Sequence, residues 1–135
     1  MRMVAPEQDV DALGHISNIA YVRWIQDVAV AHSAAVGFEP EQYLQRGSVF
    51  VVRKHEVEYL RSAKGGDEIE LITFVASFRG AQSERHTRIV RLSDGQELVR
   101  AVTTWVYVSM ESGRPRRIPV ELQDAFYRRA TVVES

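Results

Sequence analysis

A short segment near the start of the chain carries a carboxylate, a glycine, an imidazole and an amide in close succession. It reads Asp-Val-Asp-Ala-Leu-Gly-His-Ile-Ser-Asn over residues 9–18, and Asn18 begins the only long helical pattern of the chain. Backbone N–H groups at a helix N-terminus lack intrahelical partners and carry the positive end of the helix dipole, so they suit a developing oxyanion. Beside them, Asp11 is placed to attack an electrophile or to activate water. We therefore interpret residues 9–18 as a candidate active site.

Each of these side chains also has an ordinary structural role. Taken alone, Asp11 is a solvated carboxylate that caps a turn, and Asn18 is a good helix N-cap. The combined spacing of Asp11, Gly14, His15 and Asn18 favours catalysis by Asp11, and one helix end can serve both capping and oxyanion binding. For His15, a direct role and a structural role both stay open. Tyr21 is expected in the core or the pocket wall.

One long helix must position this segment. Apolar residues recur with helical spacing from Asn18 to about Val36, and Gly37 follows as a stop signal. Several alanines give this helix a slim surface, so we expect it to lie against a sheet. Two shorter helical segments are expected, a single turn over residues 40–46 and a C-terminal helix over residues 120–129.

The middle of the chain is rich in β-branched and aromatic residues. Four strands are expected, over residues 49–60, 68–78, 83–92 and 97–109. Asp94-Gly95 is the clearest hairpin signal. A further short strand before Asp9 is expected at a sheet edge, because Pro6 cannot donate a backbone hydrogen bond. Both faces of the strands are partly apolar, so the face without the helix needs a cover, most simply a second copy of the chain.

Length and composition narrow the class of protein. The chain has 135 residues, which fits one domain over residues 1–135, and its net charge of −1 argues against a nucleic-acid partner. No stretch is apolar and long enough for membrane insertion or for a signal peptide. The chain has no cysteine and therefore no disulfides, and we expect a cytoplasmic protein.

Metal or cofactor chemistry has little support in the sequence. None of the four histidines, His15, His32, His55 and His86, forms a paired ligand motif. We therefore expect no metal site and no cofactor. His32, His55 and His86 are expected to be structural or exposed.

Three blocks of the sequence, taken in order, resemble one family. They are residues 9–24, which place Asp-x-Asp-x-x-Gly-His-x-x-Asn before the alanine-rich helix, residues 50–59, and Gly-Arg-Pro-Arg-Arg-Ile-Pro over residues 113–119. This order resembles the hotdog-fold acyl-CoA thioesterases, in the 4-hydroxybenzoyl-CoA thioesterase group that includes the Tol-Pal-associated thioesterases. The resemblance covers most of the chain. It implies an α+β hotdog fold, in which a long central helix packs on an antiparallel sheet of about five strands.

The resemblance also implies a role for each motif residue. Asp11, the second aspartate of Asp-x-Asp, matches the catalytic carboxylate, which acts as nucleophile or general base. The backbone N–H at Asn18 matches the group that polarises the thioester carbonyl, and His15 matches a histidine that lies near the site or braces the turn. The protein implied is an acyl-CoA thioesterase that forms a homodimer or homotetramer, with its acyl channel between helix and sheet at the dimer interface.

An acyl-CoA substrate needs cationic partners for its phosphates. The arginines of the strands and of the basic segment near the C-terminus, among them Arg79, Arg85 and Arg116, are either such partners or solvated side chains. Arg79 and Ser83 lead this set, because in such enzymes the turn between them often lets backbone approach the pantetheine arm. Arg116 and Tyr21 complete the expected substrate-binding residues.

The chain departs from the family pattern beside the motif, which leaves the acyl group undetermined. Glu7 and Gln8 stand where several members have a bulky aromatic residue, and Gln26 stands where many have a glutamate. Two other functions stay open. One is a hotdog hydratase or dehydratase, although the Pro- and Gly-rich segment typical of those enzymes is not found. The other is a non-catalytic module that binds acyl-CoA or an apolar ligand.

Overall fold

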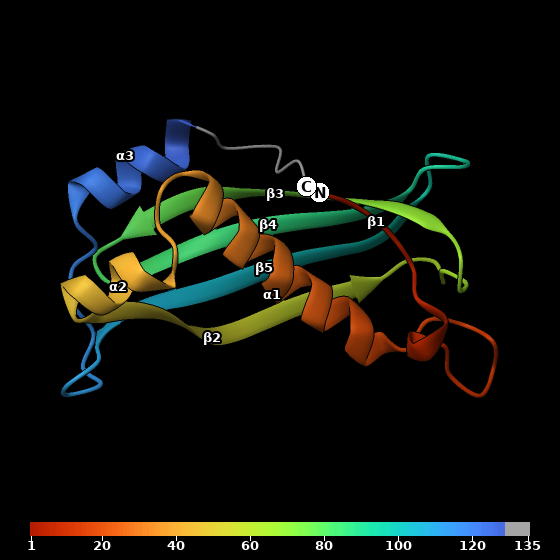
Figure 1. Cartoon of the computed structure of the whole chain (residues 1–135), viewed down its shortest axis with the longest axis horizontal. Coiled ribbons are helices and arrows are strands. Elements are labelled where there is room, and N and C mark those ends of the chain that lie inside the picture. Colours follow the sequence, from red (N-terminus) through yellow and green to blue (C-terminus); the bar gives the residue numbers. More distant parts are fainter. Residues whose placement is uncertain (129–135) are drawn as a thin grey trace.

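A five-stranded antiparallel sheet forms the base of the fold (Figure 1), in a computed structural model that describes residues 1–128. The strands lie in the order β1-β3-β4-β5-β2. Their bounds are Arg2–Val4 (β1), Ser48–Tyr59 (β2), Glu68–Arg79 (β3), Gln82–Arg91 (β4) and Glu97–Ser109 (β5). Every neighbouring pair is antiparallel, so β3, β4 and β5 form a meander that β1 and β2 extend at its two edges.

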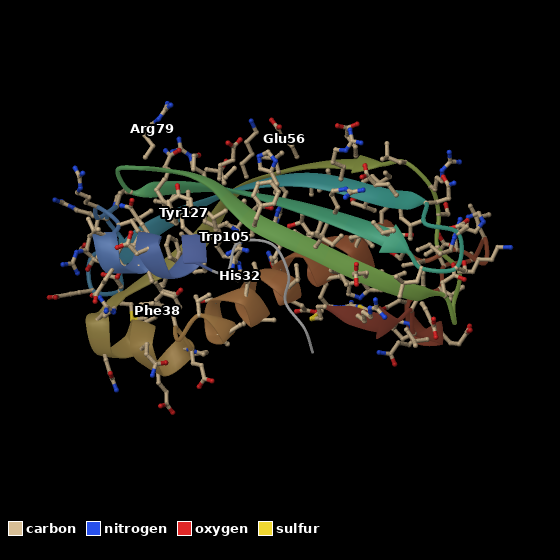
Figure 2. The ribbon with its side chains drawn as sticks, turned by 90° about the horizontal axis from the view of Figure 1, so that it is seen from above. His32, Phe38, Glu56, Arg79, Trp105 and Tyr127 are labelled. Carbon is tan, nitrogen blue, oxygen red and sulfur yellow. The ribbon has the colours of Figure 1, made fainter. Side chains whose placement is uncertain are left out.

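The three α-helices lie on one face of this sheet (Figures 1 and 2). Their bounds are Asn18–Ala35 (α1), Pro40–Arg46 (α2) and Val120–Arg128 (α3), and a single 3-10 turn, η1, spans Glu7–Asp9. α1 crosses the sheet diagonally, whereas α2 and α3 lie at the end of the sheet where α1 finishes (Figure 1). The two ends of α1 therefore meet different surroundings.

α1 buries one stripe of small and aromatic side chains against the sheet. The buried positions recur every three or four residues, as the helical period requires, and comprise Ala20, Tyr21, Trp24, Ile25, Val28, Ala29, His32 and Ser33. The first half of the stripe packs on a core that includes Ile69, Leu71 and Ile89. A second, aromatic core forms between the sheet and the shorter helices, and it includes Tyr43, Tyr107 and Phe126.

The element order and bounds agree closely with the prediction from the sequence. The helix predicted over residues 18–36 ends at Ala35, and the strands begin and end within one residue of the expected positions. At the predicted hairpin, Arg91 N donates to Gln96 O at 2.9 Å, and Gly95 adopts a positive φ of 69° that suits glycine. The C-terminal helix reaches Arg128, and the last residue predicted for it, residue 129, lies outside the described part of the chain.

The face of the sheet opposite the helices carries mixed side chains. Ile72 and Phe74 alternate with the buried residues of β3 and are partly exposed among charged neighbours. Cover by a second copy of the chain stays a prediction. Among residues 1–128, no helix is both long and apolar enough to cross a membrane.

Candidate active site

The segment before α1 is a narrow loop whose two ends are fastened together. Ser17 N donates to Asp9 O at 2.8 Å, and Asp11 N donates to His15 O at 2.7 Å. Gly14 turns the chain between these contacts with a φ of 80°, which a residue with a side chain adopts only at a cost. This loop leads directly into the first turn of α1.

The two aspartates of the motif have different surroundings. Asp9 accepts a hydrogen bond from Arg23 Nη2 at 2.5 Å, and its side chain is only 9% exposed. Asp11 is exposed, and its Oδ1 accepts from the backbone N–H groups of Leu13 at 2.9 Å and His15 at 3.2 Å. Its Oδ2 accepts from no donor in residues 1–128. Asp9 is therefore held in an ion pair, and Asp11 is the carboxylate with an oxygen available.

The N-terminus of α1 also offers an unengaged group. Ser17 is the N-cap, one residue before the cap that the sequence suggested, and its Oγ accepts from Ile19 N at 3.3 Å. Ser17 and Asn18 are both good caps, and the extended backbone at Ser17 decides between them. Asn18 becomes the first residue of the helix, and its N–H donates to no acceptor in residues 1–128. The same short segment therefore contains a helix N–H without an acceptor and a carboxylate with an available oxygen.

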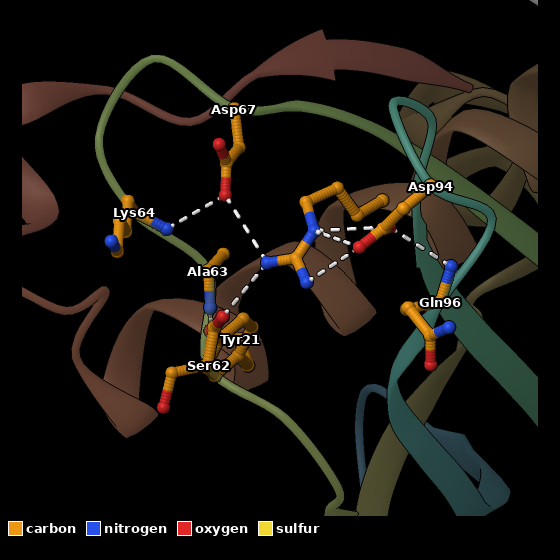
Figure 3. Close-up of polar contacts among 8 residues, drawn as sticks. Tyr21, Ser62, Ala63, Lys64, Asp67, Asp94 and Gln96 are labelled. Carbon is orange, nitrogen blue, oxygen red and sulfur yellow. Dashed lines mark hydrogen bonds and ion pairs between the residues drawn. The ribbon is translucent and has the colours of Figure 1, made fainter.

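The backbone of His15 and the hydroxyl of Tyr21 both make structural hydrogen bonds in the described chain. The His15 ring is half-buried and makes no hydrogen bond within residues 1–128, whereas its backbone closes the loop. Tyr21 is buried, and its Oη accepts from Ala63 N at 2.8 Å (Figure 3). The adjoining chain is fixed by Arg91, which contacts Asp67, Asp94 and the carbonyl of Ser62. Tyr21 thus ties the start of α1 to the loop before β3.

The other substrate-binding candidates lie at the far end of the sheet. Arg79 is exposed and points away from the helices (Figure 2). Ser83 is buried on the helix side, so these two side chains do not converge. Arg116 donates from Nη1 to Ser48 Oγ at 2.8 Å, where β2 begins. Within one chain, none of the three lies beside the loop of residues 9–18 (Figure 1).

A polar chain crosses the middle of the helix-sheet interface. Gln26 Nε2 lies 3.4 Å from His55 Nε2, and His55 Nδ1 lies 2.9 Å from Thr103 Oγ1. Burial lowers the pKa of His55, so the neutral ring is favoured. The Gln26 amide therefore faces an uncharged ring on β2.

The sequence analysis missed a cavity at the C-terminal end of α1. It has a volume of about 350 Å³ and lies between the three helices and the sheet, with mostly apolar and aromatic walls. Arg85 lines it and is only 4% exposed, so the expectation that this arginine is a solvated side chain is wrong. A sequence signal existed, because Ser83, Arg85, Thr87 and Ile89 alternate along one face of β4.

The Arg85 guanidinium contacts only uncharged acceptors. Nη1 lies 2.8 Å from His32 Nδ1 and 3.1 Å from Thr73 Oγ1, and Cζ lies 5.5 Å from the centre of the Phe126 ring. Burial lowers the pKa of Arg85 to about 10, so the group stays protonated at neutral pH. In residues 1–128, no three His, Asp or Glu side chains gather closely enough to hold a metal ion.

One protein family matches a region that includes both the loop before α1 and most of the sheet. The family described as the Thioesterase-like superfamily matches residues 5–126. The chain belongs to this superfamily. The matched region of this thioesterase-like chain contains the whole loop of residues 9–18, all of α1 and four of the five strands.

Some curated relatives of this thioesterase-like chain have a similar length, and others are much longer. The acyl-CoA thioester hydrolase YbgC of Escherichia coli O157:H7 is 28% identical over 119 residues, which cover 88% of each protein. The chloroplastic palmitoyl-acyl carrier protein thioesterase of Cuphea hookeriana is 29% identical over 107 residues, which cover 74% of this chain and 26% of that protein. The chain thus spans about a quarter of the length of such plant relatives.

Solved structures show the same fold. The putative oleoyl thioesterase from Lactobacillus plantarum superposes with a TM-score of 0.89 at 18% identity, covering 94% of this chain and 49% of that one. The 1,4-dihydroxy-2-naphthoyl-CoA thioesterase from Synechocystis gives a TM-score of 0.86 at 13% identity, covering 94% and 93%. These likenesses confirm the α+β hotdog fold that the sequence predicted.

Proposed function

We propose that this protein hydrolyses acyl-CoA thioesters to a free acid and coenzyme A, at the loop before α1. One observation carries the proposal. An exposed carboxylate with an available oxygen, on Asp11, and an unengaged helix N–H, on Asn18, belong to one short loop with fastened ends. The similarity to an acyl-CoA thioester hydrolase, YbgC, supports this class of substrate. A carrier-protein thioester is the other form of substrate, since the plant relatives act on one.

The proposed chemistry uses both groups at once. The thioester carbonyl oxygen accepts a hydrogen bond from Asn18 N–H, so the charge that develops on it meets the positive end of the helix dipole. Asp11 either attacks the carbonyl carbon, expels the thiolate and leaves an anhydride that water cleaves, or takes a proton from the attacking water. Removing an oxyanion donor typically costs ~10²–10³ in rate, and a general base contributes ~10²–10⁴.

We propose that the working enzyme is a homodimer or homotetramer. The candidates for coenzyme A binding, Arg79, Ser83 and Arg116, lie at the turn between β3 and β4 and beside the start of β2. These parts are at the opposite end of the sheet from the loop before α1 (Figure 1). A second chain that presents its own copies of these residues to the loop completes the site. In that arrangement the acyl group lies between helix and sheet at the interface.

A thiol-release assay over short, long and aromatic acyl-CoAs tests the activity. We expect release of coenzyme A thiol from at least one class of substrate. Binding without turnover across the panel would contradict the enzyme and leave a non-catalytic binding module. Hydration of an enoyl-CoA without thiol release would instead indicate a hydratase.

A further inference from the structure

The cavity at the end of α1 contains a buried cation that the described chain does not neutralise. No carboxylate of residues 1–128 lies within 4.0 Å of the Arg85 guanidinium. His32 Nδ1 faces an arginine N–H, so this nitrogen is the hydrogen-bond acceptor and the ring proton sits on Nε2. The His32 ring is therefore neutral in this arrangement. Buried charges in proteins are normally paired, so Arg85 is an exception that calls for a partner.

The unmatched nitrogens of the cavity wall are all donors, and the Ser83 hydroxyl, which also makes no hydrogen bond within residues 1–128, can donate as well. Arg85 uses Nη1 on His32 and Thr73, and its Nε and Nη2 donate to no acceptor in residues 1–128. Trp105 also lines the cavity, and its buried Nε1 has no acceptor in the same part of the chain. Nε and Nη2 are the two adjacent nitrogens that a carboxylate meets side-on with two parallel hydrogen bonds. The missing partner is therefore an anionic acceptor.

The rest of the cavity wall favours a ligand with an apolar hydrocarbon part. Its volume of about 350 Å³ falls in the range of small-molecule sites, and its walls include the rings of Phe38, Phe50, Phe78 and Phe126. We propose that this cavity binds an apolar carboxylic acid, with its carboxylate on Nε and Nη2 of Arg85 and its hydrocarbon part against these rings. Ser83 also lines this cavity, so the cavity adjoins the proposed coenzyme A contacts, but binding of a free acid does not require thioester hydrolysis.

For a thioester and a cavity in the same chain, the position of the cavity favours a free acid over the far carboxylate of a dicarboxylic acyl-CoA. Arg85 contacts His32, and Asn18 lies fourteen residues earlier on the same helix. At 1.5 Å per residue the two points are ~20 Å apart, more than a ten-carbon acyl group can span. Within one chain, an acyl group whose thioester lies at Asn18 does not reach Arg85.

Isothermal titration calorimetry of the full-length chain tests the proposal. The ligands are decanoate and decan-1-ol, which share a chain length and differ in charge. The test variant is Arg85→Met, and the matched control is Arg88→Met. Arg88 lies on the same strand but is exposed and forms an ion pair with Glu97 at the protein surface. We expect wild type and Arg88→Met to bind decanoate at least ~10-fold more tightly than decan-1-ol, and Arg85→Met to lose this preference.

Two results would overturn the proposal. One is equal binding, or no binding, of decanoate and decan-1-ol by the wild type. The other is an unchanged decanoate affinity in Arg85→Met. If Arg85→Met does not unfold cooperatively, Val30→Phe replaces it, since Val30 lines the cavity from an exposed position on α1. Val30→Phe should weaken both ligands, and unchanged binding of both would place the ligand elsewhere and reject the cavity.

Hydrolysis assays distinguish the two sources of the carboxylate. Decanedioyl-CoA and decanoyl-CoA share a chain length, and only the first carries a carboxylate at its far end. We expect Arg85→Met to change the kcat/KM ratio of these substrates by less than about threefold. A selective loss for decanedioyl-CoA would overturn the free-acid assignment in favour of the substrate's own carboxylate. The calorimetric titration still tests acid binding if neither substrate is hydrolysed, so failure of the proposed hydrolysis can be told apart from failure of the proposed acid site.

Discussion

At the scale of single residues, side chains of one type are separated by their surroundings. Asp9 and Asp11 are two positions apart, yet Asp9 is held by Arg23 and Asp11 is accessible with one unengaged oxygen. Among the arginines, Arg88 forms an ion pair with Glu97 at the surface. Arg85 is buried and contacts no carboxylate in the described chain. These contrasts decide which aspartate is proposed for chemistry and which arginine for binding.

Arg85→Met should leave the stability of the ligand-free protein nearly unchanged. The lowering of the Arg85 pKa from its usual value to about 10 corresponds to roughly 3 kcal/mol of unfavourable burial, which the substitution removes along with two hydrogen bonds worth ~1 kcal/mol each. Removing one partner of a buried ion pair would instead cost ~3–5 kcal/mol. Denaturant unfolding of wild type and Arg85→Met measures the difference in their free energies of unfolding. A loss above about 3 kcal/mol would show that Arg85 already has an anionic partner within the chain.

His55 should make the fold sensitive to mild acid. Burial lowers the pKa of His55 in the folded state, so the unfolded chain takes up a proton first as the pH falls. The stability due to its neutral form is therefore complete above the unfolded value of 6.5 and is lost as the pH drops through the folded pKa. We expect Tm to fall more between pH 7.5 and pH 5 in wild type than in His55→Gln. Parallel Tm profiles of the two proteins would contradict this.

At the scale of elements, the sequence predicts most of the architecture because each element carries its own signal. The strands follow from runs of β-branched and aromatic residues that end at turn residues, such as Asp94-Gly95, and α1 follows from its apolar stripe. The helix cap was misplaced by one residue, since propensity does not separate Ser17 from Asn18. Backbone conformation at the loop exit decides that choice.

A pair of substitutions tests the corrected cap. Ser17→Ala removes the side-chain acceptor for Ile19 N and should cost ~1 kcal/mol of unfolding free energy. Asn18→Ala leaves that cap in place and should stay within about 0.5 kcal/mol of wild type. Urea denaturation of both variants measures the two values. The reverse order, with Asn18→Ala the more damaging, would place the cap at Asn18.

The cavity was beyond local prediction for a physical reason. Its walls come from α1, α2, α3 and four strands, which are far apart in the sequence, and arginine is usually found at the surface. The alternation of Ser83, Arg85, Thr87 and Ile89 showed which face of β4 holds Arg85. It did not show that α2 and α3 would close over that end of the sheet.

At the scale of the whole molecule, the proposed hydrolytic loop and the proposed coenzyme A residues occupy opposite ends of one chain (Figure 1). The long edge strand β2 and the mixed outer face of the sheet are both available to a second copy. A site shared between two chains reconciles these positions with a single reaction.

Mixing two inactive variants tests the shared site. Asp11→Asn lacks the carboxylate, and a double variant, Arg79→Ala with Arg116→Ala, lacks the proposed phosphate contacts. After unfolding and refolding together in equal amounts, half of the dimers combine both chains and contain one intact site, so activity should recover to about a quarter of wild type. Analytical ultracentrifugation confirms the dimer. No recovery in refolded mixed dimers would place the whole site within one chain.

The central claim is that the Asp11 carboxylate carries out thioester hydrolysis at the start of α1, and one measurement addresses it directly. The Asp11→Asn substitution keeps the side-chain oxygen that accepts from Leu13 and His15, and replaces the unengaged oxygen by an uncharged amide nitrogen. The measurement compares kcat for the best acyl-CoA substrate in wild type, Asp11→Asn and the surface control Asp27→Asn. We predict a loss of ~10² or more for Asp11→Asn, with unchanged Tm and a fully active control. Activity of Asp11→Asn within a few-fold of wild type would contradict the claim.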